Sequence, residues 1–165
     1  MNSLNSLRRV SALTLLIAGF AGTAVADDTG TLNVTANVAP SCLLNSVGTM
    51  AFGTLNQAAD NNAQADISWV CTVGYNTTIE LDGGGSGSIA ARAMGGAGTL
   101  PYQLYTDSAR TIVFGDGGTG TAVPVSGVGY GSPGTVTVYG QVTQANAAAA
   151  GSGNYTDAVG VTVIF

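Results

Sequence analysis

A short run of strictly alternating residues near the start of the chain constrains the fold more than any other feature. Residues 31–39 read TLNVTANVA, in which every second residue is apolar: Leu32, Val34, Ala36 and Val38. A period of two over this length predicts a β-strand with one buried face. Pro40 ends the strand, because proline has no N–H to give to a ladder. On the pattern alone, this strand could pair within its own domain or be lent to another molecule.

The residues ahead of this strand have the features of an export signal. Arg8 and Arg9 precede an apolar run over residues 10–20, and residues 24–26 read AVA, a typical cleavage site. The apolar run is too short to span a membrane. The sequence therefore predicts a signal peptide over residues 1–26 and a mature chain of one domain that begins near Asp27. No second apolar stretch of about 20 residues follows, so we expect the product to be released.

The predicted mature chain is strongly acidic. It keeps two arginines against nine acidic residues, a net charge of −7, and it has no lysine and no histidine. Binding to nucleic acid or to anionic lipid depends on lysine and arginine, so we expect neither partner. Charged residues make up 8% of the sequence, against about a quarter in ordinary domains. A surface built from uncharged polar residues suits a protein outside the cell, or one covered by copies of itself.

The chain has two cysteines, Cys42 and Cys71. In an exported chain they are expected to form a disulfide bond. A disulfide bond lowers the entropy of the unfolded chain, and for a loop of this length it is expected to stabilise the folded state by about 3–4.5 kcal/mol. With no histidine to activate a thiol or to complete a zinc site, we expect no catalytic residues, no metal and no cofactor.

Two further patterns in the sequence resemble functional sites. The first is a set of carboxylates whose spacing brings no two of them together, so that turn positions are favoured over a hydrolase pair: Asp66, Glu80, Asp82, Asp107, Asp116 and Asp157. The second is the G-x-G-x-x-G sequence at residues 115–120. A phosphate-binding loop requires a helix directly after it, whereas TAVP follows here, so the pattern indicates a turn between strands.

The rest of the chain predicts an all-β sandwich, because strand-like segments recur about every ten residues between glycine-rich turns. The predicted strands cover residues 42–47, 65–73, 77–81, 88–94, 100–105, 111–114, 121–125, 135–142 and 158–165. Residues 50–55 are predicted as a further segment, in which Gly53 makes a bend or a bulge. Residues 56–64 and 144–154 are predicted loops, the second with one helical turn. In the strand at 65–73, alternation places Ile67, Trp69, Cys71 and Val73 on one face, and a buried tryptophan near a disulfide is typical of a sandwich core.

In this order, the segments resemble the spore coat protein U domain family. The resemblance is carried by the alternating N-terminal strand, by Cys42 and Cys71, by FGTL at 52–55, by YQLYTDSAR at 102–110 closing on FG at 114–115, by VYG at 138–140, and by GNYTD at 153–157 leading into the last strand. The family includes the pilin subunits of archaic, Csu-type chaperone–usher pili.

The resemblance implies an incomplete immunoglobulin-like β-sandwich over residues 41–165 that is completed by donor-strand exchange. Residues 27–40 would be the donor, with the side chains of Leu32, Val34, Ala36 and Val38 entering the groove of a neighbour. The groove edge, which a periplasmic chaperone would hold first, would be the last strand, with Val159, Val161, Val163 and Phe165. The other implied partners are an outer-membrane usher and identical or related pilin subunits. The product would be a pilus at the cell surface, secreted through the periplasm, that supports adhesion and biofilm formation.

The sequence leaves two alternatives open. A monomeric secreted or coat protein of the same family would use its own N-terminal strand to complete its own fold. A small outer-membrane β-barrel would explain a last strand with phenylalanine at position 165, but aromatic residues are only 7% of the sequence and the cysteine pair is foreign to that pattern.

Overall fold

The computed structural model describes residues 27–165, so the predicted signal peptide lies outside the described part of the chain. The chain divides into two units, residues 1–36 and 37–165. The described residues of the first unit, 27–36, form no helix or strand and are exposed. None of the helices within residues 27–165 is both long and apolar enough to cross a membrane.

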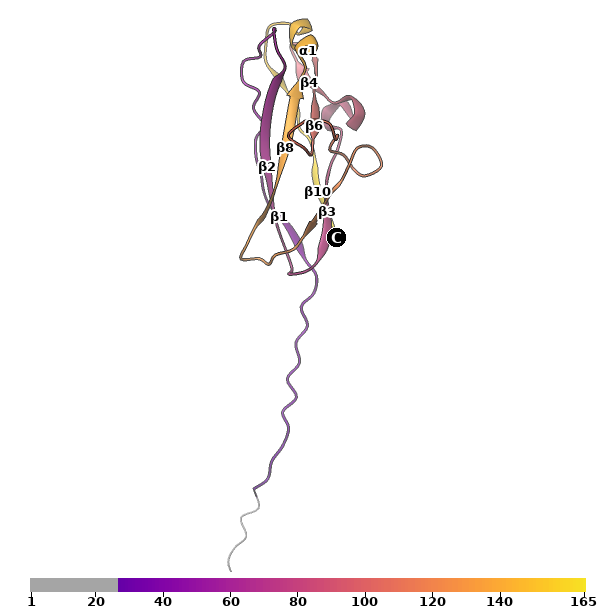
Figure 1. Ribbon diagram of the computed structural model, residues 1–165. Helices are drawn as coiled ribbons and strands as arrows, with labels where there is room; N and C mark the ends of the chain where they lie inside the picture. Colours follow the sequence, from indigo (N-terminus) through magenta and orange to yellow (C-terminus); the bar gives the residue numbers. More distant parts are fainter. Residues whose placement is uncertain (1–26) are drawn as a thin grey trace, which may run out of the picture. The chain divides into compact units, whose positions relative to one another are not determined.

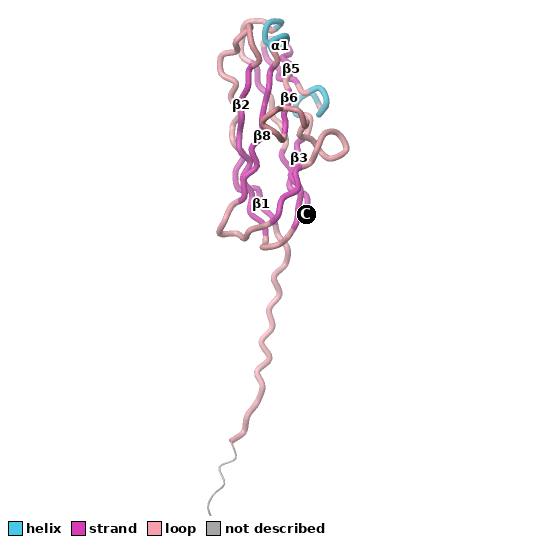
Figure 2. Tube along the Cα trace, viewed as in Figure 1, coloured by secondary structure: helices cyan, strands magenta, loops and turns pink. Residues whose placement is uncertain are grey.

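The second unit is built almost entirely of β-strands (Figures 1 and 2). The strands are β1 (Cys42–Val47), β2 (Asn61–Cys71), β3 (Asn76–Leu81), β4 (Ala93–Gly96), β5 (Thr99–Pro101), β6 (Gln103–Tyr105), β7 (Val123–Ser126), β8 (Gly134–Val142), β9 (Tyr155–Thr156) and β10 (Val161–Ile164). Two 3₁₀ turns, η1 (Gly84–Ser86) and η2 (Ile89–Ala91), and one short helix, α1 (Gln144–Ala149), complete it. The predicted all-β class is confirmed.

The strands form three open, antiparallel sheets. Their orders are β1-β2-β8-β6, β10-β3-β7 and β5-β4-β9. The longest ladder joins β2 to β8, from Asn61 opposite Val142 to Trp69 opposite Gly134. β1 and β10 are edge strands of two different sheets. β7 is an edge strand too, as the presence of Pro124 predicts.

The core lies between the sheets and follows the period of two in β2. Ile67, Trp69 and Cys71 are buried, as predicted, whereas Val73 lies beyond the end of β2 and is exposed, so its predicted place in the core is wrong. Opposite Trp69, a Cβ atom on Gly134 would lie 2.4 Å from the indole ring, so only glycine fits there. Other core side chains are Ile79, Leu81, Leu100, Leu104, Phe114, Val138 and Val142.

Three predicted segments differ from the structure. β2 begins at Asn61, inside the predicted loop, because β8 offers a pairing partner that far along. The predicted strand at 88–94 is instead η2 followed by the start of β4, and Arg92 between them turns into the interior. The last strand is regular only over Val161–Ile164, because residues 157–160 cross from one sheet to another.

Other expectations hold in detail. β1 covers the predicted residues 42–47, and α1 supplies the helical turn expected within 144–154. The hairpin around residues 106–110 is present, since the Thr106 amide donates to the Ile112 carbonyl at 2.9 Å. Gly53 has a φ of 65°, which makes the expected bend, but residues 50–55 form no strand.

Candidate functional site: a groove between two edge strands

The candidate site is an apolar groove between β1 and β10. These strands belong to different sheets and lie close together, but no ladder joins them within residues 27–165. A cavity of about 430 Å³ lies between them, with Ile67, Leu81, Leu104 and Val138 among its walls. A second cavity of about 660 Å³ shares lining residues with the first and extends to α1; the shared residues are Met50, Phe52, Met94, Tyr155 and Thr156. The two cavities are therefore neighbours, and the apolar groove is the first one, which lies between β1 and β10.

The β10 edge of the groove has backbone groups that face away from its own sheet. The Asp82 amide donates to the Gly160 carbonyl at 3.1 Å, so Gly160 faces β3. Backbone groups alternate sides along an antiparallel strand, so those of Val159, Val161 and Val163 point away from β3. The side chains of these three valines are partly buried against the core. This edge therefore offers both unpaired backbone N–H and C=O groups and apolar side chains to an added strand.

The β1 edge is arranged in the same way. The Gly48 amide donates to the Asp66 carbonyl at 2.8 Å, so Gly48 and Ser46 face β2, while the backbone of Val47 faces the other side. The Val47 side chain lines the first cavity. A bulge between Leu44 and Ser46 shifts the alternation along the strand. An extended strand laid in the groove would therefore find pairing groups on both sides.

Asp82 and Arg92 hold the middle of the β10 edge in place. Arg92, which is fully buried, donates from Nε (2.9 Å) and Nη2 (2.6 Å) to the Asp82 carbonyl, the group a regular ladder would give to Gly160. The Gly160 amide donates to Asp82 Oδ1 instead, at 2.8 Å. Burial lowers the pKa of Arg92, and Tyr102 and nearby carboxylates oppose that shift. Arg92 Nη1 also donates to Gln103 Oε1 at 2.7 Å, so the buried charge is stabilised by neutral oxygens.

Asp157 holds the preceding part of the same edge. Its Oδ1 accepts hydrogen bonds from the amides of Gly85 (2.7 Å) and Ala158 (2.8 Å), and its Oδ2 accepts one from the Tyr102 hydroxyl (2.6 Å). Burial, and then this hydrogen bond to Asp157, raise the pKa of Tyr102 well above its usual value. A Cβ atom on Gly84 would lie 2.4 Å from the Asp157 carboxylate. The Asp157 carboxylate therefore fixes the crossover between β9 and β10.

The sequence did not reveal the role of Arg92. The segment 88–94 was predicted as a strand, and the partners of Arg92 lie ten or more residues away. The available signal was the isolation of a cation, one of two in the predicted mature chain, within a run of alanine and glycine. The carboxylates of Asp82 and Asp157 are not an acid–base pair, because both accept hydrogen bonds from backbone amides.

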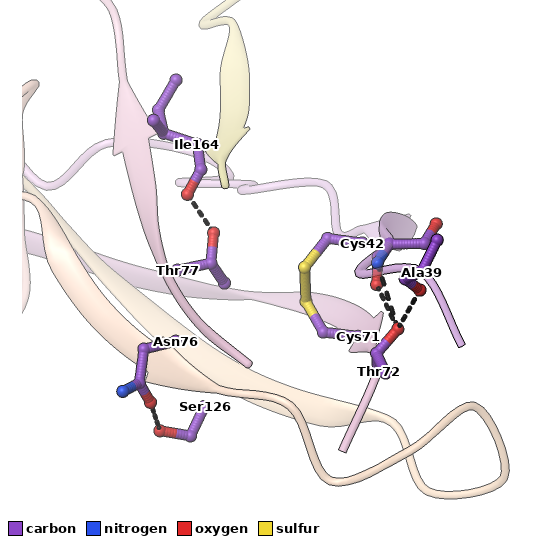
Figure 3. The surroundings of a disulfide bond; sticks show 9 residues. Ala39, Cys42, Cys71, Thr72, Asn76, Thr77, Ser126 and Ile164 are labelled. Atoms are coloured by element: carbon purple, nitrogen blue, oxygen red, sulfur yellow. Dashed lines mark hydrogen bonds between the residues drawn. A yellow bond between two sulfur atoms is a disulfide. The ribbon is translucent and has the colours of Figure 1, made fainter. Parts of the chain in front are cut away.

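The predicted disulfide bond is present at the end of the domain where β1 begins. It joins Cys42 of β1 to Cys71 of β2, which lie opposite each other with a Cα–Cα distance of 4.1 Å (Figure 3). At the same pole the Thr77 hydroxyl donates to the Ile164 carbonyl, tying the end of β10 to β3. Both edges of the groove are thus anchored where β1 begins and β10 ends.

The predicted donor residues are exposed. Leu32, Val34 and Val38 have exposed fractions of 86%, 83% and 78%, Ala36 is exposed as well, and no strand includes them. Among the predicted groove-edge residues, Phe165 follows the alternation of Val161 and Val163 but has an exposed fraction of 61%. Val159 and Val161 therefore line the cavity, Val163 packs against the core, and Phe165 is exposed to solvent.

The glycine-rich segment at residues 115–120 is a turn. Asp116 Oδ1 accepts hydrogen bonds from the amides of Gly118 (2.9 Å) and Thr119 (2.6 Å), which lower the pKa of Asp116, with the Thr119 amide the larger cause. Thr121, directly after the turn, pairs with Phe114 rather than starting a helix. Within residues 27–165, no group of three or more His, Cys, Asp or Glu side chains is placed to hold a metal.

Comparison with known proteins agrees with this architecture. The crystal structure of the CsuC–CsuE chaperone–tip adhesion subunit pre-assembly complex, from archaic chaperone–usher Csu pili of Acinetobacter baumannii, contains a chain with a similar fold. The TM-score is 0.53 at 22% sequence identity, over 78% of the present chain and 40% of that chain. No curated protein matches the sequence significantly. Residues 28–162 match the Spore Coat Protein U domain, a family that points to a structural, non-enzymatic protein. The chain therefore belongs to the Spore Coat Protein U domain family.

Proposed function

We propose that the chain is a structural subunit of a chaperone–usher pilus, and that it polymerises head-to-tail by donating residues 31–39 to the groove of the next copy. The groove itself carries the proposal. Two edge strands from different sheets flank an apolar cavity, and each has backbone groups facing it. One added strand would join the two sheets, as in β-strand addition.

The donor segment fits this groove in length and in period. Extended chain rises about 3.3 Å per residue, so Leu32 to Val38 spans about 20 Å, as residues 158–164 would if extended. The four alternating apolar side chains match the period of the groove-edge valines, Val159, Val161 and Val163. Each leucine or valine buried contributes about 1.5–3 kcal/mol, before the cost of association is subtracted.

The same geometry accounts for the proposed partners. An apolar edge that is not paired invites aggregation, so a periplasmic chaperone would cover the strand bearing Val159, Val161 and Val163 until assembly. An outer-membrane usher would then pass the groove to the donor segment of another subunit. Each copy gives one strand and receives one, so the contact does not close on itself and builds a filament. The filament would lie at the cell surface and support adhesion and biofilm formation.

The experiment compares two aspartate substitutions on opposite faces of the donor segment. Val34→Asp would bury a carboxylate in the groove without a partner, at a cost of several kcal/mol. Asn37→Asp adds the same charge on the polar face. We expect Val34→Asp to yield a folded, disulfide-bonded protein that forms no fibres in electron micrographs, and Asn37→Asp to form fibres as the unchanged chain does. Fibres from Val34→Asp, or its failure to fold at all, would contradict the proposal.

A further inference from the structure

The junction between the donor segment and β1 is held on both sides of Pro40. The Ser41 amide donates to the Thr72 hydroxyl at 3.0 Å, and the Thr72 amide donates to the Ser41 carbonyl at 2.9 Å. The Thr72 hydroxyl, which has one proton, lies 3.4 Å from the Ala39 carbonyl and 3.3 Å from the Ser41 carbonyl. Cys42, the next residue, is bonded to Cys71 (Figure 3). Residues 39–42 are therefore fastened to the end of β2.

If the donor segment is a groove strand, such fastening is needed. A strand tethered to its own groove acts at an effective concentration on the order of millimolar. At micromolar subunit concentrations, insertion into the chain's own groove would exceed insertion into a neighbour's roughly a thousandfold. A polymerising chain therefore needs a feature that opposes closure on itself.

Closure would require a tight turn between Val38 and Cys42, because β1 starts at the pole where the donor segment joins the domain. Two-residue hairpin turns need a positive φ at their first central residue. In a turn with Pro40 and Ser41 at its centre, Pro40 cannot adopt a positive φ, because its ring fixes φ near −65°. In a turn with Ala39 and Pro40 at its centre, a positive φ would strain Ala39.

Longer turns have other costs. A three-residue turn over residues 39–41 places its left-handed residue at Ser41, which would break the hydrogen bonds between Ser41 and Thr72. A turn of four or five residues would consume Val38, one of the four apolar donor residues.

We propose that this junction, made of Pro40, Ser41 and Thr72 beside the Cys42–Cys71 bond, prevents the chain from completing its own groove and directs residues 31–39 into a second copy. The inference rests on the function proposed above. The junction is a positioning element: it decides whether the donor strand closes a monomer or links two copies.

The test installs the turn that the chain lacks. In the full chain, the double variant Pro40→Asn and Ser41→Gly places an Asn-Gly pair, the preferred type I′ sequence, at the junction. We expect this variant to remain monomeric in light-scattering measurements as its concentration rises, and to form no fibres. We also expect it not to bind a fluorescent peptide of residues 29–39. The unchanged chain should form fibres and take up the peptide. Polymerisation and peptide uptake by the double variant at the unchanged rate would overturn the inference and leave the proposed function standing.

A second pair of variants tests the contact itself, should the double variant fail to fold. Thr72→Val removes the hydroxyl at constant shape, and Thr135→Val is its control, since Thr135 is exposed and its side chain makes no hydrogen bond within residues 27–165. We expect a several-fold larger monomer fraction for Thr72→Val and no change for Thr135→Val. Equal fractions would contradict the inference.

Adding Val34→Asp to the double variant separates this inference from the function on which it rests. A chain closed on itself should lose thermal stability with this change, because Val34 then lies in its own groove. If Val34→Asp alters neither stability nor assembly in either background, residues 31–39 are not a groove strand, and both proposals fall.

Discussion

Asp157 should be a main determinant of the stability of the groove edge. Asp157→Ala removes the acceptor for the Tyr102 hydroxyl and for two backbone amides. Tyr102 is buried, so its orphaned hydroxyl costs about 1–3 kcal/mol, whereas Gly85 and Ala158 are more open and can bond to water. We therefore expect the free energy of unfolding to fall by about 1–3 kcal/mol.

Two comparisons make this prediction specific. Asp157→Asn keeps an oxygen for the two amides, and its amide group can donate to the Tyr102 oxygen, so it should cost less than Asp157→Ala. Asp66→Ala is the control, because Asp66 is exposed and its hydrogen bond from the half-buried Thr137 lies at the surface. This change should cost no more than about 0.5 kcal/mol. Urea unfolding followed by circular dichroism measures all three. A loss from Asp157→Ala no larger than from Asp66→Ala would refute the reasoning.

Two further predictions concern pH and the disulfide bond. Because the pKa of Tyr102 is raised in the folded chain, the folded chain keeps a proton that the unfolded chain releases near pH 10. The free energy of unfolding should therefore fall as the pH rises above 10, by up to about 1.4 kcal/mol per pH unit. Tyr102→Phe should make this decline less steep in unfolding measurements between pH 9 and 11, and an unchanged slope would contradict the prediction. The double variant Cys42→Ser and Cys71→Ser opens a loop with a sequence separation of 29 and should lower the free energy of unfolding by about 3.5 kcal/mol. A reducing agent should destabilise the unchanged chain by the same amount and leave the variant unaffected. If neither change alters stability, the disulfide bond does not stabilise the fold by restricting the unfolded chain.

The alternation of apolar and polar residues, together with the predicted export signal, was enough to predict much of the fold. The strands β1, β3 and β8, the core positions of Ile67 and Trp69, and the Cys42–Cys71 bond follow from local patterns whose cause is local: one buried face per strand, and an oxidising destination. The edge position of β7 follows from Pro124 for the same kind of reason.

The groove could be anticipated from the family resemblance, but its construction could not be predicted from local sequence. Its two edges are more than a hundred residues apart in the chain, and their shape depends on contacts such as Tyr102 with Asp157, 55 residues apart. The strand predicted at 88–94 does not form as predicted because Arg92 is buried. A buried cation needs hydrogen-bond acceptors, and Arg92 finds them in the carbonyl oxygens of Leu81 and Asp82. The donor role of Leu32, Val34, Ala36 and Val38 stays a prediction.

The most direct test of the central claim is a helical reconstruction of filaments by electron cryomicroscopy, at a resolution that traces the backbone. We expect residues 31–39 of one copy to lie between β1 and β10 of the next, with Leu32, Val34, Ala36 and Val38 directed into the groove. A filament in which each groove holds the chain's own N-terminal segment, or in which the copies touch only through their outer surfaces, would contradict the account.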